Sequence, residues 1–215
     1  MDVRKGYLAE QFSTASQQRE ATYLGMWLFL STEIMMFGAL FLVIGYYRLH
    51  YPQPVAEAVH HLHFVLAGCN SALLLTASLC MSLVVKASRQ EYHRHVQLWL
   101  VLAALLGLGF LGLKGFEYAW EYREGLLPGS PNESPLTNPG SRLYMVIYLF
   151  STALHALHVS IAVVLALGMA ARIHFGHMKL PERAITLEMV GLYWHLVDVI
   201  WILLYPALYL LGRPA

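Results

Sequence analysis

The chain has 215 residues, of which 58% are hydrophobic and only 13% are charged, and its mean hydropathy is +0.52. This balance excludes an ordinary water-soluble domain and is typical of a protein that crosses a membrane several times. The formal net charge is +1, so the composition gives no indication of nucleic acid as a partner.

Five apolar stretches follow a polar N-terminal arm, residues 1–22. Each approaches or exceeds the roughly 20 apolar residues that a helix needs to cross a bilayer. The arm has no separate apolar segment before a cleavage site, so we expect the first span to act as its own insertion signal. Residues 23–215 are therefore predicted to form an all-α domain, a bundle of five transmembrane helices. The spans cover about residues 23–47, 62–85, 96–119, 143–171 and 189–211.

The first span carries a carboxyl group near its middle, at Glu33. An ionisable side chain at that depth costs roughly 2.5 to 3.5 kcal/mol on insertion scales, so it usually has a partner or a function. We consider two interpretations of Glu33. It is either part of a site that handles protons or lipid headgroups, or a structural hydrogen-bonding group that contacts another helix.

Small residues run through the third span, at Gly107, Gly109, Gly112 and Gly115. Small side chains let two helices approach closely. We therefore expect this span to lie in the centre of the bundle rather than to face lipid.

The end of the third span is rich in acidic and aromatic residues and also holds Lys114. Aromatic residues gather at membrane interfaces because their rings are amphipathic, which is the simplest interpretation. The acidic groups, with Lys114 and Arg123, would also suit a docking surface or a network of ion pairs. The acidic members are Glu117 and Glu121.

Two histidines, His155 and His158, lie three residues apart in the fourth span. One helix face carries both, and His195 from the fifth span is a candidate to join them at a metal or haem. A chelating pair needs further ligands, and neither a cysteine nor a His–Glu signature completes a set. We therefore assign no metal and favour hydrogen bonds between helices.

The fifth span holds an aspartate one helical turn after a histidine, His195 and Asp198, and Glu188 lies two turns before that histidine. The spacing puts His195 and Asp198 on one face and Glu188 on nearly the same side. Lipid cannot satisfy such a polar stripe, so it must face protein or trapped water.

Basic residues are distributed unequally between the two sides of the membrane. Nine fall on the side of the N-terminus, and they are Arg4, Lys5, Arg19, Lys86, Arg89, Arg94, Arg172, Lys179 and Arg183. Five fall on the other side, and they are Arg48, Lys114, Arg123, Arg142 and Arg213. The positive-inside rule predicts a cytoplasmic N-terminus and a C-terminus outside.

These segments, in this order, resemble subunit III of haem–copper terminal oxidases, the cytochrome c oxidase subunit III family, in its five-helix form. The resemblance runs from about Tyr23 to the C-terminus. Its most specific element is the pattern Tyr-Trp-His-x-Val-Asp-x-x-Trp at residues 193–201. It also rests on Glu33, Asn70-Ser71, Glu117-Tyr118, His155-Ala156-Leu157-His158-Val159 and the start of the last block at Glu188.

The resemblance implies an accessory, non-redox subunit of a proton-pumping respiratory oxidase in the bacterial inner membrane. Such a subunit has no haem or copper of its own, stabilises subunit I, binds phospholipid and supports proton uptake. Haem and copper belong to the partner subunits, which are expected to be subunits I and II and a small subunit IV. Cytochrome c or a quinol would supply the electrons.

By position, Glu33 matches the intramembrane glutamate of the family, and the resemblance implies the same role for it. Proton-related, lipid-related or structural duties are implied for the other polar residues of the spans, which are His155, His158, Glu188, His195 and Asp198. Candidates for contacts with neighbouring subunits are Glu117, Tyr118, Trp194 and Trp201.

The sequence lacks the two leading helices of the seven-helix members, so lipid sites that need them are not carried over. Three alternatives remain open. The chain could serve a quinol oxidase or a nitric oxide reductase as accessory subunit. It could be a di-haem membrane cytochrome, with His155, His158 and His195 as axial ligands. It could also be a small proton-coupled transporter that uses Glu33, His195 and Asp198.

Overall fold

The computed structural model of the protein describes residues 11–90, 93–177 and 184–210. The regular secondary structure of these ranges is helical, and five of the helices are long and apolar enough to cross a membrane. This confirms the predicted all-α, five-span fold. The elements are α1 (Ala15–His50), α2 (Pro52–His60), α3 (Phe64–Ser88), α4 (His93–Arg123), α5 (Pro139–His174), α6 (Ala184–Tyr205) and a π-helical turn, η2 (Pro206–Leu210).

Most of the long helices extend beyond the predicted spans. α1 has 36 residues, which is about 54 Å of helix against a hydrocarbon core of about 30 Å. It begins where Thr14 accepts a hydrogen bond from the Gln17 backbone N–H at 3.2 Å, an ordinary N-cap. The predicted polar arm therefore contains the first turns of α1, whereas residues 1–10 lie outside the described part of the chain.

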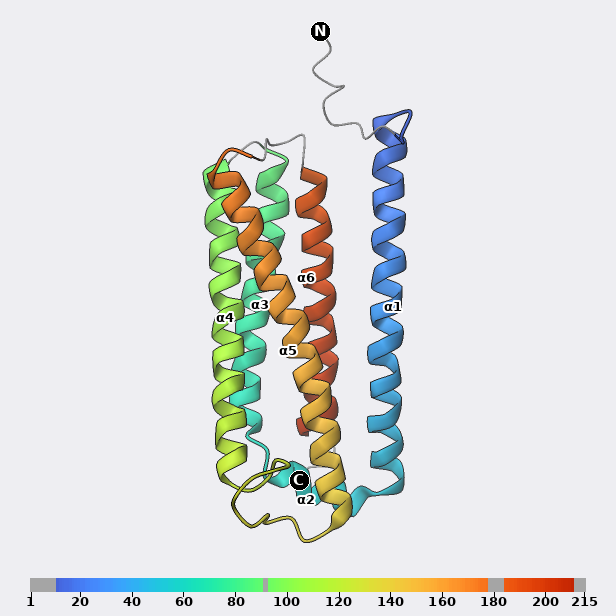
Figure 1. Ribbon diagram of the computed structural model, residues 1–215, viewed down its shortest axis with the longest axis vertical. Helices are drawn as coiled ribbons and strands as arrows, with labels where there is room; N and C mark the ends of the chain where they lie inside the picture. Colours follow the sequence, from blue (N-terminus) through green and yellow to red (C-terminus); the bar gives the residue numbers. More distant parts are fainter. Residues whose placement is uncertain (1–10, 91–92, 178–183, 211–215) are drawn as a thin grey trace.

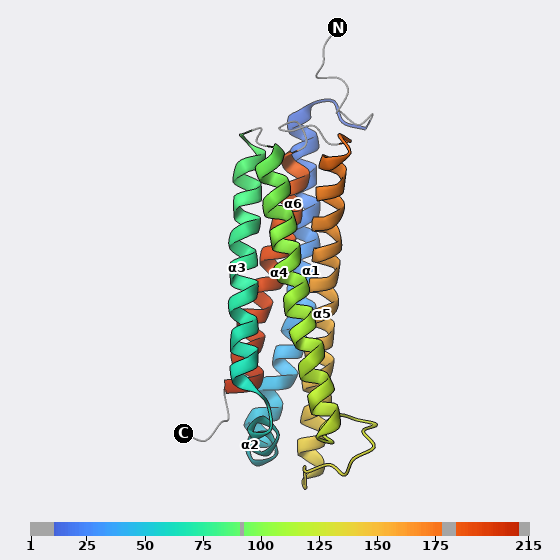
Figure 2. The ribbon, with the colours of Figure 1, turned by 90° about the vertical axis from the view of Figure 1, so that its left-hand side faces the viewer.

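The two ends of the bundle differ in what connects the helices (Figures 1 and 2). We call one end the N face, where α1, α4 and α6 begin and α3 and α5 end. The other end is the C face, which carries α2, the loop of residues 124–138 and η2. Because the number of spans is odd, the start of α1 and the end of α6 lie on opposite faces.

The helix in the centre of the bundle is α6, and α1 is the most peripheral. Of the most apolar 18-residue window of each helix, 61% is buried inside the chain in α6, 33% in α4 and 17% in α1. Figure 1 shows α1 standing beside the group formed by α3, α4, α5 and α6. The prediction that the third span is central was therefore wrong, because α4 buries one side only and exposes Leu98, Leu105 and Phe116 on the other.

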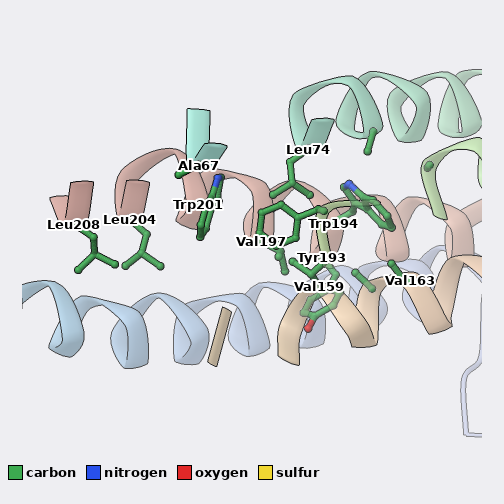
Figure 3. Packing of buried hydrophobic residues seen from close by; sticks show 14 of the residues in the cluster. Ala67, Leu74, Val159, Val163, Tyr193, Trp194, Val197, Trp201, Leu204 and Leu208 are labelled. Atoms are coloured by element: carbon green, nitrogen blue, oxygen red, sulfur yellow. The ribbon is translucent and has the colours of Figure 1, made fainter. Parts of the chain in front are cut away.

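Aromatic side chains of α6 fill the interior. Trp194 and Trp201 are each 1% exposed, and in Figure 3 Trp194 lies toward Val163 of α5 while Trp201 lies beside Ala67 of α3. Of the four glycines in the third span, Gly107 makes the close approach: a β-carbon there would lie 2.7 Å from Cγ2 of Val163. A β-carbon at Gly112 or Gly115 would meet no atom within 4 Å. A close contact between helices therefore accounts for the glycine at position 107 but not for those at 112 and 115.

The short helix α2 on the C face was not predicted, although its sequence carries the signal. Pro52 stands at its first position, where the missing N–H costs nothing. Val55, Ala58 and Val59 follow at helical spacing and are buried. Nine residues are too few to cross a membrane, so the hydropathy pattern indicates only a connection between two spans here.

Glu57 ties α2 to the start of α5 outside the membrane. Its Oε2 accepts a hydrogen bond from the Ser141 hydroxyl at 2.5 Å, and its Oε1 accepts from the Thr137 backbone N–H at 2.7 Å. These bonds, led by the one from Ser141, hold the pKa of the Glu57 carboxyl below its ordinary value of 4.5. The ionised carboxylate therefore stabilises the folded C face.

We expect Glu57→Gln to lower the stability of the subunit at pH 7 by about 1 kcal/mol, because hydrogen bonds to an ionised group are stronger than those to an amide. A folded-state pKa below the unfolded one means that the stabilisation is present above pH 4.5 and is lost as pH falls through the folded-state pKa. Thermal unfolding of the native and variant proteins between pH 7 and pH 3 measures both effects. Curves that stay a constant distance apart down to pH 3 would contradict this assignment, and Ser141→Ala should cost less in the Glu57→Gln background.

Candidate functional site

A carboxyl–imidazole pair links α1 to α5 in the middle of the spans. Oε2 of Glu33 lies 2.9 Å from Nε2 of His158, and both side chains are largely buried. Phe37 of α1 packs edge-on against the imidazole ring at 5.2 Å. The structure thus gives Glu33 a partner on another helix, as one of its two interpretations required.

The hydrogen bond made by Nδ1 of His158 determines which protonation states the pair can adopt. Nδ1 lies 2.7 Å from the carbonyl oxygen of Leu154 one turn back, so it carries a hydrogen and donates it. Nε2 then either accepts the proton of a neutral Glu33 or, as part of an imidazolium ion, donates its own to the carboxylate. In both cases the pair holds one shared proton and has no net charge.

His155, three residues earlier on α5, has different surroundings. Its ring stacks on Trp201 of α6 with centroids 4.9 Å apart and meets the edge of Phe110 of α4 at 5.6 Å. The side chain is fully buried, and neither ring nitrogen has a hydrogen-bond partner. His155 and His158 therefore make different contacts, although they lie three residues apart on one helix.

On α6, Glu188 is the centre of a polar cluster at the N face. Its Oε1 accepts hydrogen bonds from Nε and Nη2 of Arg89, each at 3.0 Å. Its Oε2 accepts one from the Tyr23 hydroxyl of α1, and Nη2 of Arg19 lies 4.0 Å from the same oxygen. Glu188 thus connects α6 to both α3 and α1.

His195, two turns further along α6, contacts two serines of α3. Its Nδ1 lies 2.8 Å from Oγ of Ser78, and its Nε2 lies 3.4 Å from Oγ of Ser82. Asp198 follows one turn later, is 4% exposed, and its Oδ2 has no hydrogen-bond partner. The predicted stripe does face protein, but His195 takes its hydrogen bonds from α3 rather than from Asp198.

The three histidines proposed as axial ligands do not converge on a common site. His158 faces α1, His155 stacks against α6, and His195 faces α3 with both ring nitrogens engaged. No group of three or more His, Cys, Asp or Glu side chains suited to a metal ion occurs in the described ranges. The arrangement does not fit a haem held by these residues.

The acidic end of α4 forms a buried hydrogen-bonded network around one ion pair, close to one of the predicted interpretations, although Arg123 is exposed and lies outside it. Nζ of Lys114 lies 3.0 Å from Oε2 of Glu117 and donates to the hydroxyls of Tyr148 and Tyr209. The Tyr148 hydroxyl donates to Glu121 at 2.7 Å, and the Tyr209 hydroxyl to Glu117 at 2.7 Å. All five side chains are buried.

This network had an incomplete signal in the sequence. Lys114, Glu117 and Glu121 recur at helical spacing on one face of α4, which indicates a shared partner. The two tyrosines come from α5 and η2, 34 and 95 positions away from Lys114. Sequence reasoning missed them because nothing local marks a tyrosine as part of a buried ion-pair network.

Three of the four candidates for contacts with other subunits lie inside the chain. Glu117, Trp194 and Trp201 are each at most 1% exposed, and Tyr118 is half-buried with its hydroxyl 2.6 Å from that of Thr152. The three buried side chains cannot form a surface for a partner, whereas the half-buried Tyr118 stays a candidate. The large apolar side chains at the surface belong to other positions, such as Leu24, Trp27, Leu28, Met35 and Leu42 on α1.

Residues 5–213 match the profile of a protein family described as "Cytochrome c oxidase subunit III". The chain is similar to a protein of Staphylococcus epidermidis named "Probable quinol oxidase subunit 3", with 28% identity over 207 residues, which is 95% of this chain and 96% of the relative. A Staphylococcus aureus protein of the same name is 28% identical over 199 residues, or 92% of each chain. The match thus covers all five spans.

Proposed function

The chain belongs to the cytochrome c oxidase subunit III family and is an accessory subunit of a haem–copper oxidase, and we propose that it supports the proton supply of that oxidase through Glu33 and His158. The pair carries one shared proton in the middle of the spans, between the peripheral helix α1 and the bundle. This one contact supports the proposal most directly. A proton held between a carboxyl and an imidazole keeps the pair neutral at a depth where an isolated charge is costly.

The way α1 is attached suits this role. Polar contacts hold it at three levels: Tyr23 to Glu188 near the N face, Glu33 to His158 in the middle, and Arg48 to the Ala207 carbonyl at 2.5 Å near the C face. The rest of α1 presents apolar side chains outward. We propose that subunit I and phospholipid cover this outer surface, and that subunits II and IV complete the complex.

We propose that the chain itself binds no haem or copper and that these groups belong to the partner subunits. The di-haem alternative is not favoured, because the three histidines it requires face three different helices. The names of the relatives support a quinol as the electron donor of the complex, whereas the family description points to cytochrome c. Oxygen uptake by the purified oxidase with each donor in turn decides between them.

The proposed location is a bacterial inner membrane with the N face toward the cytoplasm. Among the described residues, Arg19, Lys86, Arg89, Arg94 and Arg172 lie at the N face. Arg48, Arg123 and Arg142 lie at the C face, and Lys114 is buried within the bundle. The other basic residues on which the predicted orientation rests lie outside the described residues, and they are Arg4, Lys5, Lys179, Arg183 and Arg213.

We expect Glu33→Gln to leave the oxidase assembled but to slow its proton uptake roughly two- to tenfold, well below the effect of about a hundredfold for an acid at a reacting bond. The amide of glutamine can donate a hydrogen bond to His158, so the attachment of α1 survives, but it cannot exchange a proton. Proton uptake and the half-life of activity during turnover at alkaline pH measure the effect.

Ser31→Ala is the matched control, because Ser31 lies on the same helix and its exposed hydroxyl bonds only to the Trp27 carbonyl. It should behave as the native protein. A Glu33→Gln oxidase with normal proton uptake and a normal lifetime at alkaline pH would refute the proton role.

A further inference from the structure

A cavity of about 300 Å³ lies between α1, α3 and α6 near the N face. Its lining includes Tyr23 from α1, Ser82 and Arg89 from α3, and Glu188 and His195 from α6. A space of this size with several polar groups has room for a group of water molecules. It is separate from the Glu33–His158 pair, which lies between α1 and α5.

The mouth of the cavity is charged and reaches the end of the bundle. The Arg89 side chain is 61% exposed and that of Arg19 is 60% exposed, while the carboxylate they share, on Glu188, is 10% exposed. Arg89 stands just past the end of α3, where the membrane-spanning part of that helix stops. The charged groups therefore lie where the aqueous phase begins.

The floor of the cavity lies deeper in the membrane. His195 is seven residues past Glu188, or about 10 Å further along the helix axis. The Ser82 hydroxyl donates to the Ser78 carbonyl, so its oxygen is left to accept a hydrogen bond from Nε2 of His195. Nδ1 then accepts from the Ser78 hydroxyl.

Ser78 extends the connection one turn further. Asp198 lies one turn after His195 on α6, with Ser78 and the Trp194 indole as polar neighbours of its carboxyl, and its Oδ2 is buried without a hydrogen-bond partner. A buried carboxyl oxygen without a partner is costly when it is charged, which favours a protonated Asp198. One turn beyond Asp198 the indole of Trp201, 1% exposed, fills the interior (Figure 3).

We propose that the cavity is a water-filled inlet that connects the aqueous phase at the N face to His195 and, through Ser78, to Asp198. When Asp198 gives up a proton, the Ser78 hydroxyl accepts it and passes its own to Nδ1 of His195. The Ser82 hydroxyl accepts the hydrogen of Nε2, turns away from the Ser78 carbonyl and gives its own hydrogen to cavity water, which becomes hydronium. The reverse transfer reloads the carboxylate, so Asp198 stores a proton drawn from one side of the membrane.

The charged and titratable groups around His195 suit a site that is open to protons. α6 supplies Glu188 and Asp198, α3 supplies Arg89, and α1 supplies Tyr23 and Arg19. The two guanidiniums are held by the one carboxylate at the mouth, which leaves the ring and Asp198 as the proton carriers inside.

The inlet itself is tested by the accessibility of Ser82 in the assembled oxidase in membrane vesicles. Ser82→Cys places a thiol on the cavity wall, in a background in which the exposed Cys69 is alanine. A charged, membrane-impermeant thiol reagent should label it at least about tenfold faster than Thr76→Cys, because only a hydrated thiol ionises and reacts. Thr76 is the matched control, since it lies on the same helix, is exposed, and does not line the cavity.

The side of access is set by a marker, Gln90→Cys, at the N-face end of α3. Labelling of Ser82→Cys from the side that labels Gln90→Cys supports the inlet. Labelling no faster than that of Thr76→Cys, or labelling from the opposite side, overturns it.

The link to Asp198 is tested by the exchange of its carboxyl proton in heavy water, followed by infrared spectroscopy of the same oxidase. Asp198→Asn identifies the band. We expect Ser78→Ala to slow the exchange at least about tenfold, because it removes the hydroxyl that joins the ring to the carboxyl, and to leave Ser82→Cys labelling unchanged. Thr76→Ala should exchange at the native rate.

Unchanged exchange in Ser78→Ala, or no exchange in the native protein, refutes the connection. Glu33→Gln should alter neither readout, so the inlet stands or falls independently of the role proposed for Glu33.

Discussion

Lys114→Met is expected to destabilise the subunit by about 3 to 5 kcal/mol, the usual cost of removing one partner of a buried ion pair. Lys114 is the one cation held within the buried network described on α4, and it faces Glu117 at 3.0 Å, with Glu121 close by. Without it, two carboxyls remain in an apolar interior with only the Tyr148 and Tyr209 hydroxyls as partners. The amount of this subunit retained in purified oxidase, and the temperature at which it dissociates, measure the loss.

Two further variants make this prediction specific. Lys114→Met combined with Glu117→Gln and Glu121→Gln should recover much of the stability, because neutral amides leave no unpaired charge. Lys86→Met, at an exposed lysine of the N face, should have no measurable effect. A single Lys114→Met oxidase as stable as the native complex would show that the network adds nothing to the fold.

Gly107→Ala is expected to destabilise the bundle by about 1 to 3 kcal/mol, the range for forcing an extra carbon into a packed core. The new β-carbon would lie 2.7 Å from Cγ2 of Val163 on α5 and 3.3 Å from Cη2 of Trp194 on α6. Neither neighbour has space to move, because both are buried. Thermal dissociation of the subunit from the oxidase measures the change.

Val163→Ala should rescue part of this loss, since it removes the methyl group that the new β-carbon meets, and the double-mutant cycle isolates that contact. Gly112→Ala, on the same helix, is the matched control, because its β-carbon would meet no atom within 4 Å. Equal losses in Gly107→Ala and Gly112→Ala would mean that the helix backbone, not the contact with α5, requires glycine.

How far the sequence predicted the site differs from residue to residue. Glu33 and the stripe of Glu188, His195 and Asp198 were identified because a polar side chain within an apolar run is conspicuous in any one-dimensional pattern. Their partners were not. His158 is 125 positions from Glu33, and Ser78 is 117 positions from His195. No local pattern selects one pair from many at such separations.

The histidines of α5 show the limit of helical spacing. His155 and His158 were placed on one face, and three residues do return to nearly the same side of a helix. Three residues turn the helix by about 300°, so the two rings point about 60° apart. That difference is enough for one ring to meet Glu33 on α1 and the other to stack on Trp201 of α6.

The sequence alone determined the fold class, the number of spans and the family resemblance. Each of these depends on the positions of apolar runs and of the few polar residues that interrupt them. These positions are local properties of the sequence, so they can be recognised without knowing how the helices pack. Only the tertiary structure decided which helix is central, which glycine is in contact, and which partner each buried polar group takes. Those features depend on how the helices are rotated and placed against one another, which packing across the whole chain sets and no single segment encodes.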